Sequence, residues 1–226
     1  MIQRIERFDQ IDLPDDAVVI ADRALPEAMI EAFADPLLVE AGESLKTLES
    51  VGELAEQVLG RRASRPLTIV AVGGGSVGDA VGFLASTLWR GVDLWHVPTT
   101  FLAMVDSAHG GKTAVNLGEA KNQLGTFYPA DRVLLVEQAL ETLGLDRRRE
   151  GLAELVKGLW LGGADAFDEL EADGGVGELT AAPFEETGQR LMGLLERAIS
   201  VKQDIVERDM RETKGIRTYL NFGHTA

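Results

Sequence analysis

Short apolar runs alternate with longer helical segments over the first part of the chain. Runs rich in Val, Ile and Leu predict buried strands at residues 17–20, 37–39, 67–72, 94–97 and 132–136. Between them, residues 48–58 and 77–88 carry apolar side chains at helical spacing. Strands that alternate with helices usually form a parallel sheet covered on both faces. The pattern therefore predicts a Rossmann-like α/β domain with a parallel sheet.

The strand pattern stops near residue 145. Residues 150–161, 164–171, 184–208 and 216 onward have helical periodicity, whereas residues 172–177, which contain Gly and Asp, predict a loop. We therefore expect two domains, an α/β domain at residues 1–145 and an all-helical domain at residues 146–226. Small-molecule sites often lie in clefts between domains, so we expect the chemistry at their junction.

Composition narrows the class of protein. The 226 residues include 22 Lys and Arg against 37 Asp and Glu, a net charge of −15, with three His and no Cys. The lack of Cys excludes zinc ribbons and thiol chemistry. The negative charge disfavours nucleic acid, since the basic run at residues 147–149 is flanked by Asp146 and Glu150. With no signal-like N-terminus and no long apolar stretch, we expect a cytoplasmic protein without a membrane partner.

A glycine-rich turn follows the strand that ends at Val72. Gly73, Gly75 and Gly78 have the G-x-G-x-x-G spacing between a strand and a helix, which favours a phosphate or dinucleotide site. The alternative is a tight turn that needs glycine only for steric reasons. The usual ribose-binding acid at the end of the next strand is missing, so Glu43 and Lys46, in a loop that enters a helix, are the candidates for that role.

Two further groups of polar residues are candidates for ligand binding. Between Pro98 and Pro129, glycines surround Asp106, His109, Lys112, Asn116, Lys121 and Asn122. Such side chains suit a phosphorylated, hydroxylated ligand, although an exposed polar loop is the alternative.

In the helical part, Glu154 and Lys157 are three residues apart, and Arg217, Asn221 and His224 would share one stripe of a helix. Lys202 lies one helix upstream and could join that stripe in binding an anion. Glu154 and His224 could instead hold a divalent metal, while a surface ion pair is the alternative for Glu154 and Lys157.

The motifs together resemble those of 3-dehydroquinate synthases, which belong to the sugar-phosphate cyclases. The resemblance runs from about Gly42 to the last residue through GGGSVGD, LWRG, PTTFLAMVDSAHGGKTAVN, KNQLGTF, GLAELVK and IRTYLNFGHT. It implies an NAD-binding α/β domain, a helical domain, a Zn²⁺ or Co²⁺ ion and a homodimer. The implied reaction is the cyclisation of 3-deoxy-D-arabino-heptulosonate 7-phosphate to 3-dehydroquinate with loss of phosphate, a carbon–oxygen lyase step of the shikimate pathway.

The resemblance also implies roles for individual residues. NAD would be bound by Glu43, Lys46, Gly74, Gly75, Asp79, Thr99, Thr100 and Lys121. The catalytic group would comprise Asp106, Lys112, Lys157, Lys202, Arg217 and Asn221. Substrate contacts would come from Arg90, Lys112, Asn122, Lys202, Arg217 and Asn221, and the metal ligands would be Glu154 and His224. Arg90 would reach the site of the neighbouring subunit.

The chain departs from the family pattern in ways that keep alternatives open. The family continues past NFGHT with further His residues, so we expect the helical domain to be incomplete here, with two of the three protein ligands of a catalytic zinc. His109 stands where the family usually carries a small apolar residue, which could alter the pocket.

One alternative is another sugar-phosphate cyclase, acting on sedoheptulose 7-phosphate or a related substrate, or a related metal-dependent NAD alcohol dehydrogenase. Lys202 and Arg217 favour a carboxylated substrate over a neutral sugar phosphate. The other alternative is a truncated, non-catalytic NAD-binding module.

Overall fold

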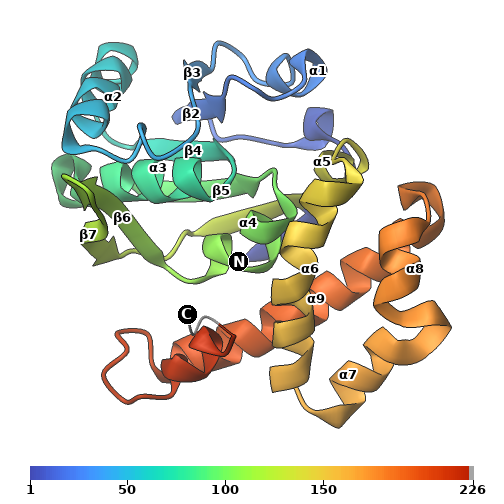
Figure 1. Cartoon of the computed structure of the whole chain (residues 1–226). Helices are drawn as coiled ribbons and strands as arrows, with labels where there is room; N and C mark the ends of the chain where they lie inside the picture. The colour runs from blue at the N-terminus through green and yellow to red at the C-terminus, as the bar shows by residue number, and fades with distance from the viewer. Residues whose placement is uncertain (224–226) are drawn as a thin grey trace. The chain divides into compact units, whose positions relative to one another are not determined.

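A six-stranded parallel sheet forms the core of the first of two units in the computed structural model, which describes residues 1–223 apart from the side chains of Leu145 and Asp173 (Figure 1). Unit 1 comprises residues 1–99 and 111–138, and unit 2 comprises residues 100–110 and 139–226. The helical unit thus includes a short segment from the middle of the α/β sequence. The domain boundary at residue 145 stays a prediction.

The sheet has the strand order β1-β8-β5-β4-β2-β3, and every neighbouring pair is parallel. The strands are β1 (Ile2–Ile5), β2 (Ala17–Asp22), β3 (Leu37–Val39), β4 (Thr68–Gly73), β5 (Asp93–Pro98) and β8 (Arg132–Val136). The sequence pattern predicted five of them, and the predicted α/β class is confirmed. The pattern missed β1 because this edge strand has four residues and places Gln3 and Arg4 side by side between two isoleucines, so it shows neither an apolar run nor an alternation.

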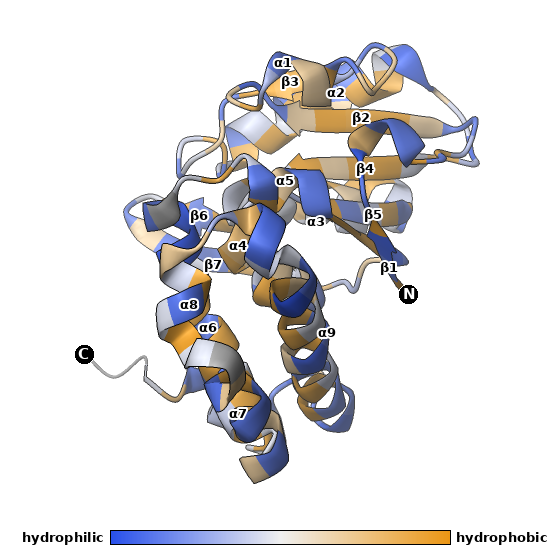
Figure 2. Ribbon diagram, turned by 90° about the vertical axis from the view of Figure 1, so that its right-hand side faces the viewer, coloured by the Kyte–Doolittle hydropathy of each residue, from blue (hydrophilic) through white to orange (hydrophobic). Residues whose placement is uncertain are grey.

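Helices cover the sheet of unit 1. They are α1 (Glu27–Ile30), α2 (Leu48–Arg61) and α3 (Gly75–Thr87), with 3₁₀ turns η1 (Phe8–Gln10) and η2 (Leu88–Arg90). The α2 helix begins at Thr47, whose hydroxyl accepts the Ser50 backbone N–H at 3.0 Å. Figure 2 shows β2 and β4 as hydrophobic along most of their length, as expected of strands buried on both faces.

The segment between Pro98 and Pro129, for which an exposed polar loop was the alternative interpretation, is largely regular structure. It forms α4 (Phe101–Val105), the 3₁₀ turn η3 (Ser107–His109) and an antiparallel hairpin of β6 (Lys112–Leu117) and β7 (Ala120–Phe127). The hairpin forms because Thr113 and Val115 alternate inward and are buried, while their polar neighbours face outward. Gly118, at φ +59°, allows the tight turn.

Unit 2 is helical, as predicted for this part of the chain. Its elements are the end of α5 (Glu137–Glu141), α6 (Leu145–Leu161), α7 (Ala164–Glu171), η4 (Ala172–Gly174), α8 (Gly175–Ala181), α9 (Phe184–Arg208) and η5 (Arg217–Asn221), together with α4 and η3. Glycines bring helices close together: an added Cβ would lie 2.6 Å from Phe101 at Gly151, and 2.9 Å from Ala198 at Gly158. These contacts pack α6 against α4 and α9.

Two predictions in the helical part were wrong. Residues 172–177 form η4 and the start of α8 rather than a loop. The helix expected from residue 216 is only the short 3₁₀ turn η5, which ends at Asn221 and is followed by Gly223 at φ +85°. Because a 3₁₀ turn has three residues per turn, Arg217 and Asn221 do not share a stripe, and His224 lies outside the described residues.

Within residues 1–223, no helix has the length and apolar character needed to cross a bilayer.

Candidate functional site

The glycine turn of unit 1 joins β4 to α3. Gly74 is the N-cap of α3 and Gly75 is its first residue, so their backbone N–H groups lie at the positive end of a 13-residue helix. At Gly73, an added Cβ would lie 2.7 Å from Val77. Glycine is therefore needed for packing at position 73, and the helix N-terminus behind it suits a phosphate group.

Lys46 links this turn to the hairpin. Its side chain is buried, and its Nζ donates to Asp79 Oδ2 at 2.7 Å and to Asn122 Oδ1 at 2.5 Å. Asp79 lies in the first turns of α3, and Asn122 lies in β7 at φ +55°. The structure therefore brings together three residues that the sequence analysis assigned to cofactor or substrate binding from three separate motifs.

Glu43 forms a second link to the same hairpin. Its carboxylate accepts from Asn116 Nδ2 at 2.7 Å and from Lys121 Nζ at 3.2 Å. The hydrogen bond from Asn116, then that from Lys121, lowers the pKa of Glu43 below its usual value. Glu43 and Lys121, both predicted to serve NAD, are thus neighbours, and Asn116 belongs with them.

The remaining candidates of unit 1 lie at the ends of elements. Thr99 is buried after β5, and its backbone N–H donates to Gly73 O at 3.0 Å, next to the glycine turn. Lys112 begins β6 and is exposed. Arg90 is exposed at φ +68° in a turn that Arg65 holds, since Arg65 Nη2 donates to the carbonyls on either side of it, those of Trp89 and Gly91.

In unit 2, Lys202 of α9 reaches the loop that follows α4. The Thr100 hydroxyl caps α4, and the loop of residues 106–110 follows that helix. The buried Lys202 Nζ donates to the backbone carbonyl of Asp106 at 2.5 Å and also pairs with its carboxylate. Burial lowers the pKa of Lys202, and the Asp106 carboxylate opposes that effect without cancelling it.

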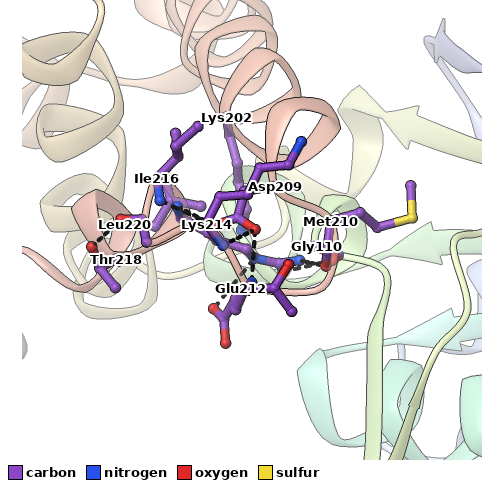
Figure 3. Close-up of polar contacts among 12 residues, drawn as sticks. Gly110, Lys202, Asp209, Met210, Glu212, Lys214, Ile216, Thr218 and Leu220 are labelled. Atoms are coloured by element: carbon purple, nitrogen blue, oxygen red, sulfur yellow. Dashed lines mark hydrogen bonds and ion pairs between the residues drawn. The ribbon is translucent and has the colours of Figure 1, made fainter.

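Arg217 reaches the same loop from η5. Its side chain is buried, and Nη2 donates to Gly110 O at 2.6 Å while Nη1 donates to Met210 O at 3.0 Å (Figure 3). Glu212 lies 3.5 Å from Nε. Burial lowers the pKa of Arg217, partly offset by the nearby carboxylates, but an arginine stays protonated at neutral pH. Two buried cations therefore converge on one loop.

Glu154 and Lys157 lie on α6, where they form an ion pair, and Lys157 Nζ also donates to Leu220 O of η5 at 2.8 Å. Both side chains are largely buried, so the alternative of an ordinary exposed pair does not describe them. A pocket of about 480 Å³ opens beside them. Its other lining residues are Ala153, Val156, Trp160, Phe167, Phe222 and Gly223, which make it mainly apolar.

The described residues do not complete a metal site. Within residues 1–223, no group of three or more His, Cys, Asp or Glu is arranged to hold a metal ion. Glu154 is the predicted ligand in this range, whereas a catalytic zinc takes three protein ligands. His109 is buried with its Nε2 2.6 Å from Met104 O, and His96 is buried in β5.

Sequence reasoning missed Asp209 and Glu212, which lie between α9 and Arg217. Asp209 is 2% exposed and accepts hydrogen bonds from the turn that leads to Arg217. A signal was present, because an acid directly after a long amphipathic helix and before a glycine-containing turn commonly accepts backbone N–H groups. Asn221, by contrast, was predicted to contact substrate and is exposed in η5.

Residues 36–226 match two models of one protein family. Residues 36–150 match the 3-dehydroquinate synthase N-terminal model, and residues 151–226 match the 3-dehydroquinate synthase C-terminal model. A curated 3-dehydroquinate synthase from Microcystis aeruginosa is 38% identical over 206 residues, which is 91% of this chain and 54% of that protein. The chain therefore spans about half the length of the curated relatives it matches.

The solved structures of similar fold include two synthases at 27–28% identity. A 2-deoxy-scyllo-inosose synthase complexed with carbaglucose-6-phosphate, NAD⁺ and Co²⁺ superposes with a TM-score of 0.82 at 28% identity, covering 99% of this chain and 63% of that one. The 2-epi-5-epi-valiolone synthase of Streptomyces hygroscopicus, with NAD⁺ and Zn²⁺ bound, gives a TM-score of 0.81 at 27% identity, covering 99% and 65%.

Proposed function

Because the chain belongs to the 3-dehydroquinate synthase family, we propose that it carries out the cyclisation of 3-deoxy-D-arabino-heptulosonate 7-phosphate to 3-dehydroquinate with loss of phosphate. The observation that carries the proposal is the convergence of Lys202 and Arg217, both buried, on the loop of residues 106–110. Buried cations suit a substrate that carries a carboxylate in addition to its phosphate. The reaction class is that of a phosphate-eliminating carbon–oxygen lyase.

Unit 1 is the proposed NAD-binding part. The N-terminus of α3 offers the N–H groups of Gly74 and Gly75 to the pyrophosphate, and Asp79 and Lys46 lie beside it. When bound, NAD would accept a hydride from the carbon that bears a substrate hydroxyl, while that hydroxyl loses its proton, and would later return the hydride. Since Lys46 and Glu43 already have partners in the hairpin, NAD would exchange places with some of those partners.

Unit 2 is the proposed carboxylate-binding part. Lys202 and Arg217 would hold the substrate carboxylate, because each nitrogen that donates to the loop carries more than one hydrogen. Lys112 and Asn122 of the hairpin would bind the substrate phosphate. Arg90 would do so in the site of the neighbouring subunit, in a homodimer that we propose to work in the cytoplasm.

The proposed Zn²⁺ or Co²⁺ ion would use Glu154 and His224. The two related structures named above contain Co²⁺ or Zn²⁺, which supports a divalent metal for this fold. Among residues 1–223, Glu154 is the one proposed ligand, and no group of three ligands is present there. We therefore assign no catalytic step to the metal in this chain.

Measurement of phosphate release by the 226-residue chain tests the proposal. With NAD and Zn²⁺ present, 3-deoxy-D-arabino-heptulosonate 7-phosphate should release phosphate and sedoheptulose 7-phosphate should not. Lys202→Met should abolish release, while Lys214→Met, at an exposed lysine of the same unit, should leave it unchanged. Release from sedoheptulose 7-phosphate alone would favour the second candidate, another sugar-phosphate cyclase.

The alternative of a non-catalytic NAD-binding module makes different predictions. Such a module would bind NAD in calorimetry but would take up no stoichiometric Zn²⁺ and release no phosphate from either substrate. Glu154→Gln would then change no measured quantity. In an active enzyme the same substitution should remove phosphate release while leaving NAD affinity intact, because Glu154 lies in unit 2.

A further inference from the structure

The carboxylate of Asp209 organises the turn between α9 and η5. Its Oδ1 accepts the backbone N–H groups of Thr213 at 2.8 Å and Lys214 at 3.0 Å, and its Oδ2 accepts those of Ile216 at 3.0 Å and Arg217 at 3.2 Å (Figure 3). A carboxylate has about four acceptor positions, so these four donors use its capacity.

The charge on Asp209 is stabilised by these contacts. Burial would by itself raise the pKa of this carboxyl group, but the N–H donors of the turn outweigh burial and hold the pKa below its usual value. The group is therefore ionised at neutral pH and acts only as an acceptor. A protonated or amide side chain could not accept from all four N–H groups at once.

This turn also determines the position of the Arg217 side chain. The backbone N–H of Arg217 is held by Asp209 Oδ2, while its guanidinium extends to Gly110 O and Met210 O. Gly110 ends the loop that carries Asp106, the partner of Lys202. The geometry of the turn thus determines where Arg217 contacts the loop that Lys202 also contacts.

The same turn leads directly into η5, which a second candidate group contacts. Lys157, the partner of Glu154, donates to Leu220 O near the end of η5. A single carboxylate therefore fixes the path of the chain between two groups of candidate residues, the Asp106–Lys202 pair and the Glu154–Lys157 pair.

We propose that Asp209 is a positioning residue of the substrate-binding site, which holds Arg217 against the loop of residues 106–110. The proposal deepens the function proposed above and rests on that function only in taking Arg217 as a substrate contact. Asp209 itself is buried beneath the turn and acts through the backbone.

Asp209→Asn is the test, since it keeps the size of the side chain and replaces one acceptor oxygen by an NH₂ group that faces two N–H donors. In this variant, amide hydrogen exchange at Thr213, Lys214, Ile216 and Arg217 should become at least about tenfold faster. The ¹⁵N NMR signal of the Arg217 Nε–H should lose its protection as well. Asp204→Asn, at an exposed carboxylate of α9, is the matched control and should change neither.

Two results would overturn the proposal. The first is an Asp209→Asn chain in which the Arg217 signal and the exchange rates of the turn are unchanged. The second, which remains measurable if that variant does not fold, comes from acid titration of the unmodified chain. The Asp209 carboxyl carbon and the Arg217 Nε–H should respond at one pH, below the ordinary range of aspartate, and independent responses would reject the coupling.

The NMR measurements need no substrate, so they separate this proposal from the proposed function. Coupled signals in a chain that releases no phosphate would reject the cyclase activity and support the positioning of Arg217. Uncoupled signals in an active chain would reject the positioning role alone.

Discussion

The pair formed by Asp106 and Lys202 should respond asymmetrically to substitution. The side chain of Lys202 is 9% exposed and that of Asp106 is 36% exposed. Asp106→Asn leaves a buried ammonium group without its counter-charge, whereas Lys202→Met leaves a carboxylate that water can reach and fills the buried space with an apolar side chain of similar length. The first change should therefore destabilise unit 2 more than the second.

The magnitudes follow from the same exposure values. Removing one partner of a fully buried pair costs about 3–5 kcal/mol, and the partial exposure of Asp106 and the remaining amide oxygen reduce this to about 2–3 kcal/mol for Asp106→Asn. For Lys202→Met we expect about 1 kcal/mol or less. The double variant should resemble Lys202→Met, because it lacks the buried ammonium group that Asp106→Asn alone leaves without its partner carboxylate.

Hydrogen exchange of the α9 amides at neutral pH is the assay. A loss of about 2–3 kcal/mol corresponds to exchange about 30–150 times faster for Asp106→Asn. Urea unfolding followed by helical circular dichroism adds a pH test. Burial lowers the pKa of Lys202, so in Asp106→Asn the unfolded chain binds more protons than the folded one, and the deficit should shrink as the pH rises from 7 towards the unfolded pKa of about 10.4.

Either of two results would refute this reasoning. One is a Lys202→Met chain that is destabilised as much as Asp106→Asn. The other is an Asp106→Asn deficit that stays constant as the pH rises towards the unfolded pKa of about 10.4. Both would mean that the aspartate acts through its hydrogen bonds rather than through its charge.

Three further predictions concern unit 1. Lys46→Met should weaken NAD binding in calorimetry by about tenfold, and unchanged affinity would assign Lys46 to the fold alone. Burial lowers the pKa of His96 to about 4, so unfolding free energy should fall by up to about 3 kcal/mol as the pH drops from 6.5 to 4, and His96→Phe should remove that slope in urea titrations. Gly125→Ala should cost about 1–3 kcal/mol in thermal unfolding, because its Cβ would lie 2.4 Å from Thr113 O, whereas Gly60→Ala, with open space around its Cβ, should cost nothing.

The regular elements with strong local signals were predictable from the sequence. The buried parallel strands and α9 each carry a long, unambiguous apolar pattern, and the glycine turn is defined by residues that adjoin one another in sequence. The hairpin of β6 and β7 was not predictable in the same way. Its exposed positions mix polar residues with Leu117 and Phe127, and Thr113 and Val115 are its buried positions, so no regular alternation marks the strand pair.

The sequence indicated which residues are candidates for the site, but not which of them contact one another. Lys46 and Asn122 are 76 residues apart, and Lys202 and Asp106 are 96 apart, so only the fold could pair them. The position of Asp209 after a long helix marks it as a candidate acceptor of backbone N–H groups. Every residue except proline carries such a group, so the sequence does not show which ones Asp209 binds.

The α4 helix has a consequence for synthesis of the chain. Its apolar residues Phe101 and Met104 are buried within unit 2, yet α6 begins at Leu145, about 40 residues later. At translation rates of about 5–20 residues per second, α4 leaves the ribosome roughly 2–8 s before its first helical partner. Until α6 is synthesised, the nascent chain therefore exposes the apolar residues of α4. At this stage aggregation or chaperone binding competes with folding.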